Sequence, residues 1–362
     1  MKVSKIPGLG RFGIFVDDVD FDHLTDEEWM EIGRLHIKNL VTIIRNTNAT
    51  LEQFNQRINQ FGTQRLNLTN ILITKYKKTM IELYQMLEQD DPVLEQSDRD
   101  MLISAKNIAL HIGSMHKVED GFTEQGIPNG PFPEGELGWH SNEPGHLTSV
   151  PGVALYGRRG MVGSATGFCT TVDWYEQQSE SFRSELDEMI VIHQFTPDKF
   201  LKGLKSKIAL NMLYQTSGPV QGSEVPMVIQ SPGGIRGLHY SYTSVFGIKG
   251  MSQKESQRIF DIIDQGIFQD QFLYDHWYQQ DHDMLLFDNS ITTHRRIGKA
   301  ENRMAARLTF DYTKLQKGFY QPYMNHGKIA RQYIQEIKQQ INNGNAADFH
   351  APTMIDYLRT FL

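Results

Sequence analysis

Apolar and polar positions in the first part of the chain follow the periods of helices and strands. Thr25-Asp-Glu-Glu28 is a capping box, and the apolar positions after it predict a helix over about residues 26–38. The run at residues 40–44 is short and β-branched, which is typical of a strand. A second capping box, Thr50-Leu-Glu-Gln53, opens an amphipathic helix whose apolar face is formed by Leu51, Phe54, Ile58 and Phe61.

Two further apolar stripes at helical spacing predict more helices in residues 69–115, so residues 1–115 form a mainly helical N-terminal part. The composition changes in residues 119–144, which are rich in Gly, Pro, Asn and Glu. This stretch predicts a long surface loop that contains Trp139 and His140. Loops of this length in compact domains are often functional.

From about residue 150 the pattern changes to short β-like runs separated by glycine, which predict a jelly-roll-like β core within residues 116–315. The runs are 153–156, 167–171, 189–192, 225–230, 238–245, 284–287 and 307–310. A capping box at residues 252–255 opens one helix inside this region, and a last amphipathic helix covers about residues 328–341 of a C-terminal extension, 316–362. The predicted fold class is α+β, with a single domain of residues 1–362.

Composition limits the class of protein. The chain has 362 residues and a formal net charge of -7, and it lacks the clustered Lys and Arg of a nucleic-acid-binding face. The single cysteine, Cys169, excludes an intrachain disulfide and a cysteine-based zinc site, which fits a reducing compartment. No segment has the length of a membrane span, and the first residues lack the pattern of a signal peptide. We therefore expect a cytoplasmic protein with neither nucleic acid nor membrane as its partner.

Two histidines have the surroundings of candidate metal ligands. Trp139-His-Ser-Asn-Glu143 places oxygen-donor side chains two and three residues after His140, and His294 follows an apolar run that ends in Asp288-Asn289. A lone histidine in such a setting is more often hydrogen-bonded than metal-bound, so neither motif identifies a site by itself. The remaining candidates lack a complete ligand set at metal spacing and are assigned no role: His116, His146, His239, His276 and His282.

The order and separation of these motifs resemble the taurine-dioxygenase-like branch of the iron(II)- and 2-oxoglutarate-dependent oxygenases over nearly the whole chain. In that family a Trp-His-x-Asp motif supplies a histidine and a carboxylate, a small-residue turn with a threonine follows, and a strand with Asp-Asn leads to the second histidine. The corresponding residues here are Trp139-His140, Gly163-Ser-Ala-Thr166, Asp288-Asn289 and His294, with Arg303 and Arg307 after them. The resemblance implies a double-stranded β-helix core.

The resemblance also implies roles for these residues. His140 and His294 would be catalytic iron ligands, since two neutral imidazoles and one carboxylate on one face of iron(II) leave positions for co-substrate and dioxygen. Arg303, with the hydroxyl of Thr166, would bind the C5 carboxylate of 2-oxoglutarate, because a guanidinium offers planar donors and a permanent charge. Arg307 would bind an anionic group of the substrate or support the site. The alternative is that Arg307 pairs with Asp311 at the rim of the sheet.

One position departs from the family pattern. The acidic ligand is replaced by Asn142, and Glu143 comes one residue later. A neutral amide oxygen is a poorer donor to iron(II) than a carboxylate, so metal affinity should fall. Three outcomes remain open: Asn142 ligates weakly, Glu143 reaches the metal through an altered loop, or the protein supplies only two ligands. We favour Asn142 at the ligand position. A halogenase is not expected, because Asn142 fills the space that a halide would need.

Two functions from different classes follow from these residues. The first is an iron(II)- and 2-oxoglutarate-dependent dioxygenase that hydroxylates an aliphatic carbon of a small anionic or zwitterionic substrate and releases succinate and CO2. The second is a binding or structural protein on the same scaffold that has lost turnover, which the Asn142 position favours. A homo-oligomer is compatible with either function.

Overall fold

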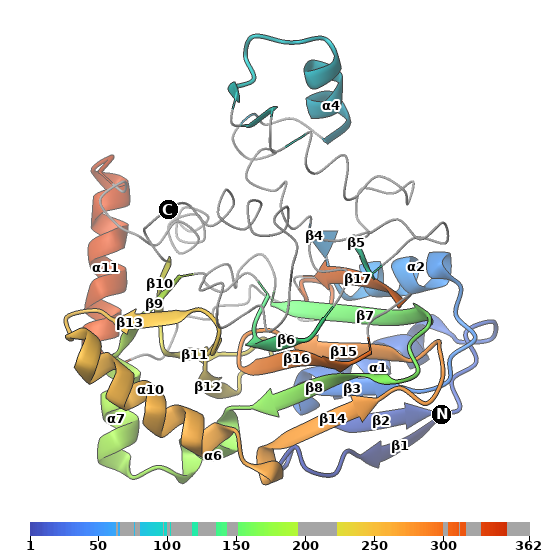
Figure 1. The fold of residues 1–362 in the computed structure, drawn as a ribbon, viewed down its shortest axis with the longest axis horizontal. Coiled ribbons are helices and arrows are strands. Elements are labelled where there is room, and N and C mark those ends of the chain that lie inside the picture. The colour runs from blue at the N-terminus through green and yellow to red at the C-terminus, as the bar shows by residue number, and fades with distance from the viewer. Residues whose placement is uncertain are drawn as a thin grey trace.

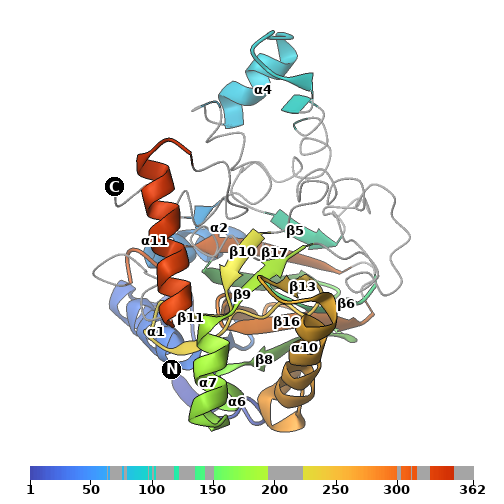
Figure 2. The ribbon, with the colours of Figure 1, turned by 90° about the vertical axis from the view of Figure 1, so that its left-hand side faces the viewer.

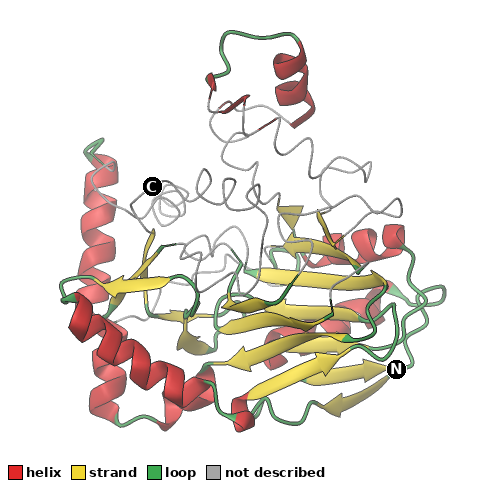
Figure 3. Ribbon diagram, in the orientation of Figure 1, coloured by secondary structure: helices red, strands yellow, loops and turns green. Residues whose placement is uncertain are grey.

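Two β-sheets packed face to face form the centre of the structure, and helices cover the outside (Figures 1 and 3). Their contact is direct, since the ring centroids of Phe168 and Phe287, one from each sheet, lie 5.3 Å apart. The computed structural model describes residues 1–62, 64–65, 76, 80–96, 98–99, 102, 118–121, 135–142, 151–194, 223–299, 303–310, 312–315 and 327–345.

The larger sheet has eight strands in the order β1-β2-β3-β15-β7-β17-β4, and β5 also pairs with β17. Neighbouring strands are antiparallel except β2 and β3. The strands of this sheet are β1 (Lys2–Lys5), β2 (Ile14–Asp17), β3 (Val41–Ile44), β4 (Gln64–Arg65), β5 (Val118–Gly121), β7 (Gly152–Arg159), β15 (Met284–Asp288) and β17 (Met304–Phe310).

The smaller sheet is antiparallel throughout and has the order β14-β8-β16-β6. Its strands are β6 (Leu137–His140), β8 (Ser164–Thr170), β14 (Leu273–Trp277) and β16 (Thr292–Gly298). The register places His140 of β6 directly opposite His294 of β16, and His294 directly opposite Phe168 of β8. Because Phe168 faces the larger sheet, this row of cross-strand neighbours lies between the two sheets.

Both faces of the larger sheet are covered, so its central strands are apolar at nearly every position. On β15, Met284 and Leu286 pack on the face that carries the N-terminal helices. Leu285 and Phe287 alternate with them and pack toward the smaller sheet. Strand β15 is therefore apolar on both of its faces.

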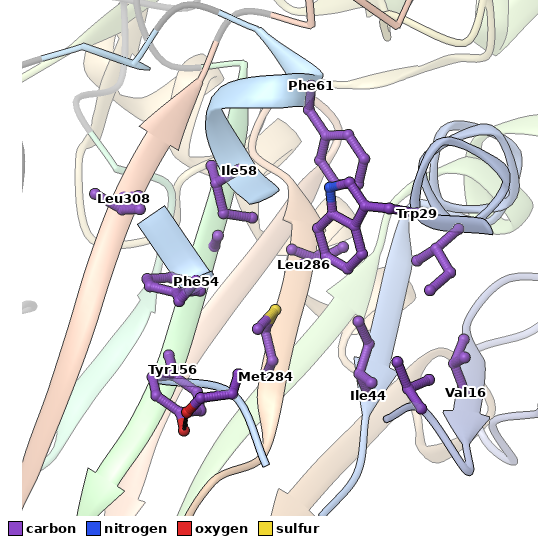
Figure 4. Packing of buried hydrophobic residues seen from close by; sticks show 14 of the residues in the cluster. Val16, Trp29, Ile44, Phe54, Ile58, Phe61, Tyr156, Met284, Leu286 and Leu308 are labelled. Carbon is purple, nitrogen blue, oxygen red and sulfur yellow. Dashed lines mark hydrogen bonds between the residues drawn. The ribbon is translucent and has the colours of Figure 1, made fainter. Parts of the chain in front are cut away.

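The N-terminal helices α1 (Asp26–Asn39) and α2 (Leu51–Phe61) cover the outer face of the larger sheet. Both begin with a complete capping box, at Thr25 and at Thr50, which satisfies backbone N–H groups of the first turn. Trp29 of α1 stacks on Phe61 of α2 with ring centroids 4.6 Å apart, above the sheet residues that Figure 4 shows. This packing fixes the two helices against β3, β15, β7 and β17.

A second group of elements lies at the other end of the sheets, where α6, α7, α10 and α11 gather (Figures 1 and 2). It contains a three-stranded sheet, β10-β9-β13, and a two-stranded sheet, β11-β12. The bounds are α6 (Val172–Gln177), α7 (Glu180–Glu188), β9 (Ile190–His193), β10 (Ser223–Pro226), β11 (Val228–Gln230), β12 (Arg236–Leu238), β13 (Val245–Ile248), α10 (Gln253–Ile267), the 3-10 helix η2 (Asp270–Phe272) and α11 (Lys328–Asn342). One further helix, α4, spans Met80–Glu88.

The structure confirms the predicted α+β class and the elements with strong local signals. Helices α1, α2, α10 and α11 begin where the capping boxes and apolar periods place them, and β3, β7 and β15 are strands. Much of the predicted helical stretch at residues 69–115 lies outside the described residues, apart from α4. None of the described helices is long and apolar enough to cross a membrane.

Three predictions for the β region are wrong. Residues 119–144 are not one surface loop, because Trp139 and His140 are buried in strand β6, paired with β16. Residues 225–230 are not one strand, since β10 ends at Pro226 and β11 begins at Val228 in another sheet. Residues 238–245 are not one strand either, since β12 ends at Leu238 and β13 begins at Val245. In addition, β1, β2 and β3 from the N-terminal part belong to the larger sheet, so the β structure extends beyond residues 116–315.

Candidate active site

His140 and His294 lie side by side between the two sheets. They are directly opposite residues of the antiparallel pair β6 and β16, their ring centroids are 4.2 Å apart, and the rings are inclined by 46°. Both are buried, with 7% and 9% of their surfaces exposed. Phe287 of β15 packs against His294 from the larger sheet, with centroids 4.7 Å apart. The sheet register itself therefore brings together two residues that are far apart in sequence.

The two imidazoles have the form that binds metals. Nδ1 of His140 donates to the carbonyl oxygen of Gly138 at 2.7 Å, which leaves the lone pair of its ring on Nε2. The pKa of His294 is held well below its ordinary value, chiefly by burial and further by His140 and Arg307, so its ring is neutral. With metal–nitrogen bonds of about 2.1 Å, imidazoles at adjacent positions of one ion have centroids roughly 4 to 5 Å apart. The observed separation fits a metal between them.

Asn142 is fixed beside the histidines by Asn289. The backbone N–H of Asn142 donates to Oδ1 of Asn289 at 2.8 Å, and Nδ2 of Asn289 donates to the backbone carbonyl of Asn142, also at 2.8 Å. The next turn is equally ordered, because the carboxylate of Asp288 accepts the N–H groups of Ser290 and Ile291. Burial raises the pKa of Asp288 to about 7. These contacts position the Asn142 side chain through its backbone.

The side chain of Asn142 contacts an arginine across the sandwich. Nη1 of Arg307, on β17 of the larger sheet, donates to Oδ1 of Asn142 at 3.1 Å. Nδ2 of Asn142 is buried and has no hydrogen-bond partner in the described part of the chain. Arg307 is also close enough to His294 to lower the pKa of that ring. His140, His294, Asn142 and Arg307 therefore form one cluster.

No acidic side chain completes this cluster among the described residues, where no group of three His, Cys, Asp or Glu side chains is arranged to hold a metal. Glu143, the alternative ligand, and Asp311, the alternative partner of Arg307, lie outside those residues. Asn142, two residues after His140, brings an amide oxygen into this cluster. Its second lone pair remains available, because one carbonyl oxygen accepts two contacts.

A second cluster has the chemistry of a carboxylate pocket. Oγ1 of Thr166 lies 3.0 Å from the hydroxyl of Tyr278, and the guanidinium carbon of Arg303 lies 6.0 Å from the centroid of the Tyr278 ring. All three residues are at most 3% exposed. Arg307 lies in β17, on the side where Ala305 packs toward the smaller sheet, and Arg303 immediately precedes that strand. A buried cation near the ring of Tyr278, whose hydroxyl contacts Thr166, suits a desolvated carboxylate.

Residues 3–309 match the family described as taurine catabolism dioxygenase TauD, TfdA family. The chain belongs to this TauD, TfdA family. The chain has the same fold as several solved structures to which its sequence identity is low. A taurine dioxygenase from Burkholderia xenovorans has 19% identity and a TM-score of 0.57, with 85% of this chain and 89% of that chain covered.

Two other structures are similar to this TauD, TfdA family member. AAD-2 in complex with Mn(II) and N-oxalylglycine has 15% identity and a TM-score of 0.56, with 90% of this chain and 100% of that chain covered. A putative alpha-ketoglutarate dependent 2,4-D dioxygenase from Burkholderia xenovorans has 15% identity and a TM-score of 0.54, covering 85% and 97%. No curated protein sequence matches the chain.

The site residues predicted for a TauD, TfdA family member fall into the two clusters. His140, Asn142, His294 and Arg307 lie in the first, while Thr166 and Arg303 lie in the second. The sequence prediction missed Tyr278, whose hydroxyl contacts Thr166. An aromatic residue just beyond the end of β14 carries no distinctive spacing, so only the folded structure reveals this contact.

Three other histidines to which the sequence assigns no role have structural partners. His276 pairs with Asp283 at 2.8 Å, and Nδ1 of His282 lies 2.9 Å from the hydroxyl of Tyr156. His239 donates from Nδ1 to the carbonyl oxygen of Ser290 at 2.8 Å. These contacts explain the three residues without a metal.

Proposed function

We propose that this protein is an iron(II)- and 2-oxoglutarate-dependent dioxygenase that hydroxylates an aliphatic carbon of a small anionic or zwitterionic substrate, with release of succinate and CO2. The single observation that carries the proposal is the opposed pair His140 and His294, buried between the sheets beside Arg307. Membership in a dioxygenase family supports it. We further propose that residues 1–362 form one domain around a double-stranded β-helix core.

The first cluster would hold the metal. His140 and His294 would be ligands, and Asn142 stands where the family has a carboxylate. When bound, iron(II) supplies the activation of dioxygen that protein side chains alone do not provide. The protein's own contribution is the fixed tautomer of His140, the position of Asn142 on its Asn289 clamp, and the exclusion of bulk water by Phe287 and the two sheets.

The second cluster would bind the co-substrate. Arg303 would pair with the C5 carboxylate of 2-oxoglutarate, and the hydroxyl of Thr166 would donate to it. Tyr278 would act as a positioning residue, because its hydroxyl contacts Thr166 and its ring lies beside Arg303. Burial strengthens the charge pairing by removing competing water. Arg307 is assigned to an anionic group near the metal, which its contact with Asn142 supports.

Asn142 also favours a second candidate function, a binding protein that retains the scaffold without turnover. An amide is a weaker metal ligand than a carboxylate. In this alternative the buried arginines would bind a small carboxylate, and the histidine pair would bind metal too weakly to support a reaction.

Succinate production separates the two functions. The protein is incubated with iron(II), 2-oxoglutarate and a panel of small anions and zwitterions that includes taurine and 2,4-D. We expect succinate from the unaltered protein in the presence of at least one panel member, and none from His140→Ala under the same conditions. If neither protein forms succinate while both bind 2-oxoglutarate, the binding-protein alternative is correct.

A further inference from the structure

We propose that the cluster of His140, His294, Asn142 and Arg307 is a binding site for an exogenous carboxylate group, which takes the place at the metal of the carboxylate that Asn142 replaces. Nδ2 of Asn142 and the guanidinium of Arg307 would donate to this group. The proposal rests on the proposed function, because it assumes a metal at the two histidines. It adds a ligand that comes from outside the chain.

The orientation of the Asn142 amide is the first argument. A guanidinium has donors and no acceptor, so the amide atom that meets Nη1 of Arg307 must be Oδ1. Nδ2 therefore points away from Arg307. The two hydrogen bonds from Asn289 to the backbone of Asn142 limit how far the Asn142 side chain can move to find another partner for Nδ2.

The second argument is the state of Nδ2. It carries two N–H donors, it is buried, and no hydrogen-bond partner for it exists in the described part of the chain. A buried amide donor without an acceptor is costly, so such groups are nearly always paired with protein, water or ligand. An amide N–H group cannot coordinate a metal, but it can donate to an oxygen that does.

Charge is the third argument. The guanidinium of Arg307 is a permanent positive charge that contacts Asn142, and a divalent metal would add two more positive charges. Among the described residues no carboxylate joins the two histidines. A site with this balance attracts an anion. A carboxylate fits better than a spherical ion, because its two oxygens can meet a metal and the N–H donors together.

The group has two possible sources with the same chemistry. It is either the carboxylate of the primary substrate or a small free carboxylate. The first source makes metal affinity depend on the substrate. The second makes metal affinity depend on any small carboxylate. Formate as the probe tests the shared chemistry, and a substrate found in the succinate assay tests the first source.

The experiment measures Co(II) binding by absorbance, without 2-oxoglutarate, in a sulfonate buffer at constant ionic strength. For the unaltered protein we expect formate to lower the Kd for Co(II) saturably by about tenfold or more, the size of a charge-assisted contact. Perchlorate at equal concentration should have no effect. An equal response to chloride would overturn the assignment to a carboxylate.

Three variants decide the mechanism. Asn142→Asp supplies the carboxylate from the chain, so it should bind Co(II) tightly without formate and show no formate response. Asn142→Leu removes the donor at similar size, so it should bind weakly and lose the response. Asn343→Asp makes the same charge change on the exposed C-cap of α11 and should behave like the unaltered protein.

The outcomes also separate this inference from the proposed function. If His140→Ala abolishes Co(II) binding but formate has no effect on the unaltered protein, the carboxylate site is refuted and the metal site stands. The same conclusion follows if Glu143→Gln alone abolishes binding, since the chain then supplies its own carboxylate. If Co(II) binding survives both His140→Ala and His294→Ala, the two histidines are not the metal ligands and the proposed function itself is refuted.

Discussion

Asn289 holds Asn142 through both of its backbone polar groups, with two hydrogen bonds of 2.8 Å each. One side chain thus satisfies a donor and an acceptor in a segment that passes directly from strand β6 into the site. The clamp links the turn after β15 to the residue that stands in the third ligand position. Its strength should therefore appear both in stability and in metal binding.

Replacement of Asn289 by Ala should weaken both properties. The loss of two buried hydrogen bonds should lower the free energy of unfolding by about 2 to 4 kcal/mol. The Kd for iron(II) should rise, because Asn142 and Arg307 lose their fixed position. Urea unfolding and metal titration measure the two effects. Asn48→Ala, which removes hydrogen bonds to Phe21 and Asp20 far from the histidines in sequence, is the control and should affect stability alone.

Arg303 and Arg307 should differ in their effect on 2-oxoglutarate binding. Arg303→Leu should weaken binding of the co-substrate by about 2 to 4 kcal/mol, because a buried carboxylate loses its charged partner. Arg307→Leu should weaken it less, since Arg307 contacts Asn142 near the metal. Calorimetric titration of the metal-loaded protein compares them. A greater loss from Arg307→Leu would reverse the assignment of the two residues.

Tyr278→Phe tests the residue that the sequence did not indicate. The change removes one hydroxyl and keeps the ring beside Arg303, so the fold and the iron(II) affinity should be unchanged. The Kd for 2-oxoglutarate should rise by about three- to tenfold, equivalent to a net hydrogen bond of about 1 kcal/mol. An unchanged Kd for 2-oxoglutarate would show that Tyr278 only packs against the pocket.

Acid should destabilise the protein through its buried neutral histidines. Burial lowers the pKa of His36 to about 3, so below about pH 6.5 the unfolded chain takes up a proton that the folded chain does not. The free energy of unfolding should fall by about 1.4 kcal/mol per pH unit for this group between about pH 6 and pH 4. The pKa of Asp288 is raised to about 7, so this group contributes to the pH dependence of the free energy of unfolding with the opposite sign.

A comparison of the unaltered protein with His36→Gln isolates the effect of His36, because Asp288 is present in both. Urea unfolding at several pH values should give a shallower acid slope for the variant, by about one proton. Parallel slopes would contradict the role of His36. His36 is distant in sequence from the proposed metal ligands, and its ring contacts are Phe310 and Tyr312.

Local signals determined how much of the fold could be predicted. The capping boxes that begin at Thr25, Thr50 and Ser252 can be recognised because each involves only four consecutive residues, and the helices begin there. Strand β6 could not be predicted from its own composition, because its Gly-rich surroundings resemble a loop. What makes it a strand is pairing with β16, more than a hundred residues away.

The same difference applies to the site. His140, His294, Thr166 and the two arginines could be proposed as site residues because they match spaced motifs. The contact between Arg307 and Asn142 depends on how the sheets pack, and so does the contact between Thr166 and Tyr278. Neither follows from sequence spacing, since each joins two segments through tertiary structure.

The most direct test of the central claim is an iron(II) titration under anaerobic conditions of the unaltered protein, His140→Ala and His294→Ala, with exposed His23→Ala as the matched control. Formate is included so that a weak third ligand does not limit binding. We predict one iron(II) per chain for the unaltered protein and for His23→Ala, and no stoichiometric binding for the other two variants, whose circular dichroism should remain that of the folded protein. Equal iron(II) binding by all four proteins would contradict the assignment of His140 and His294 as the metal site.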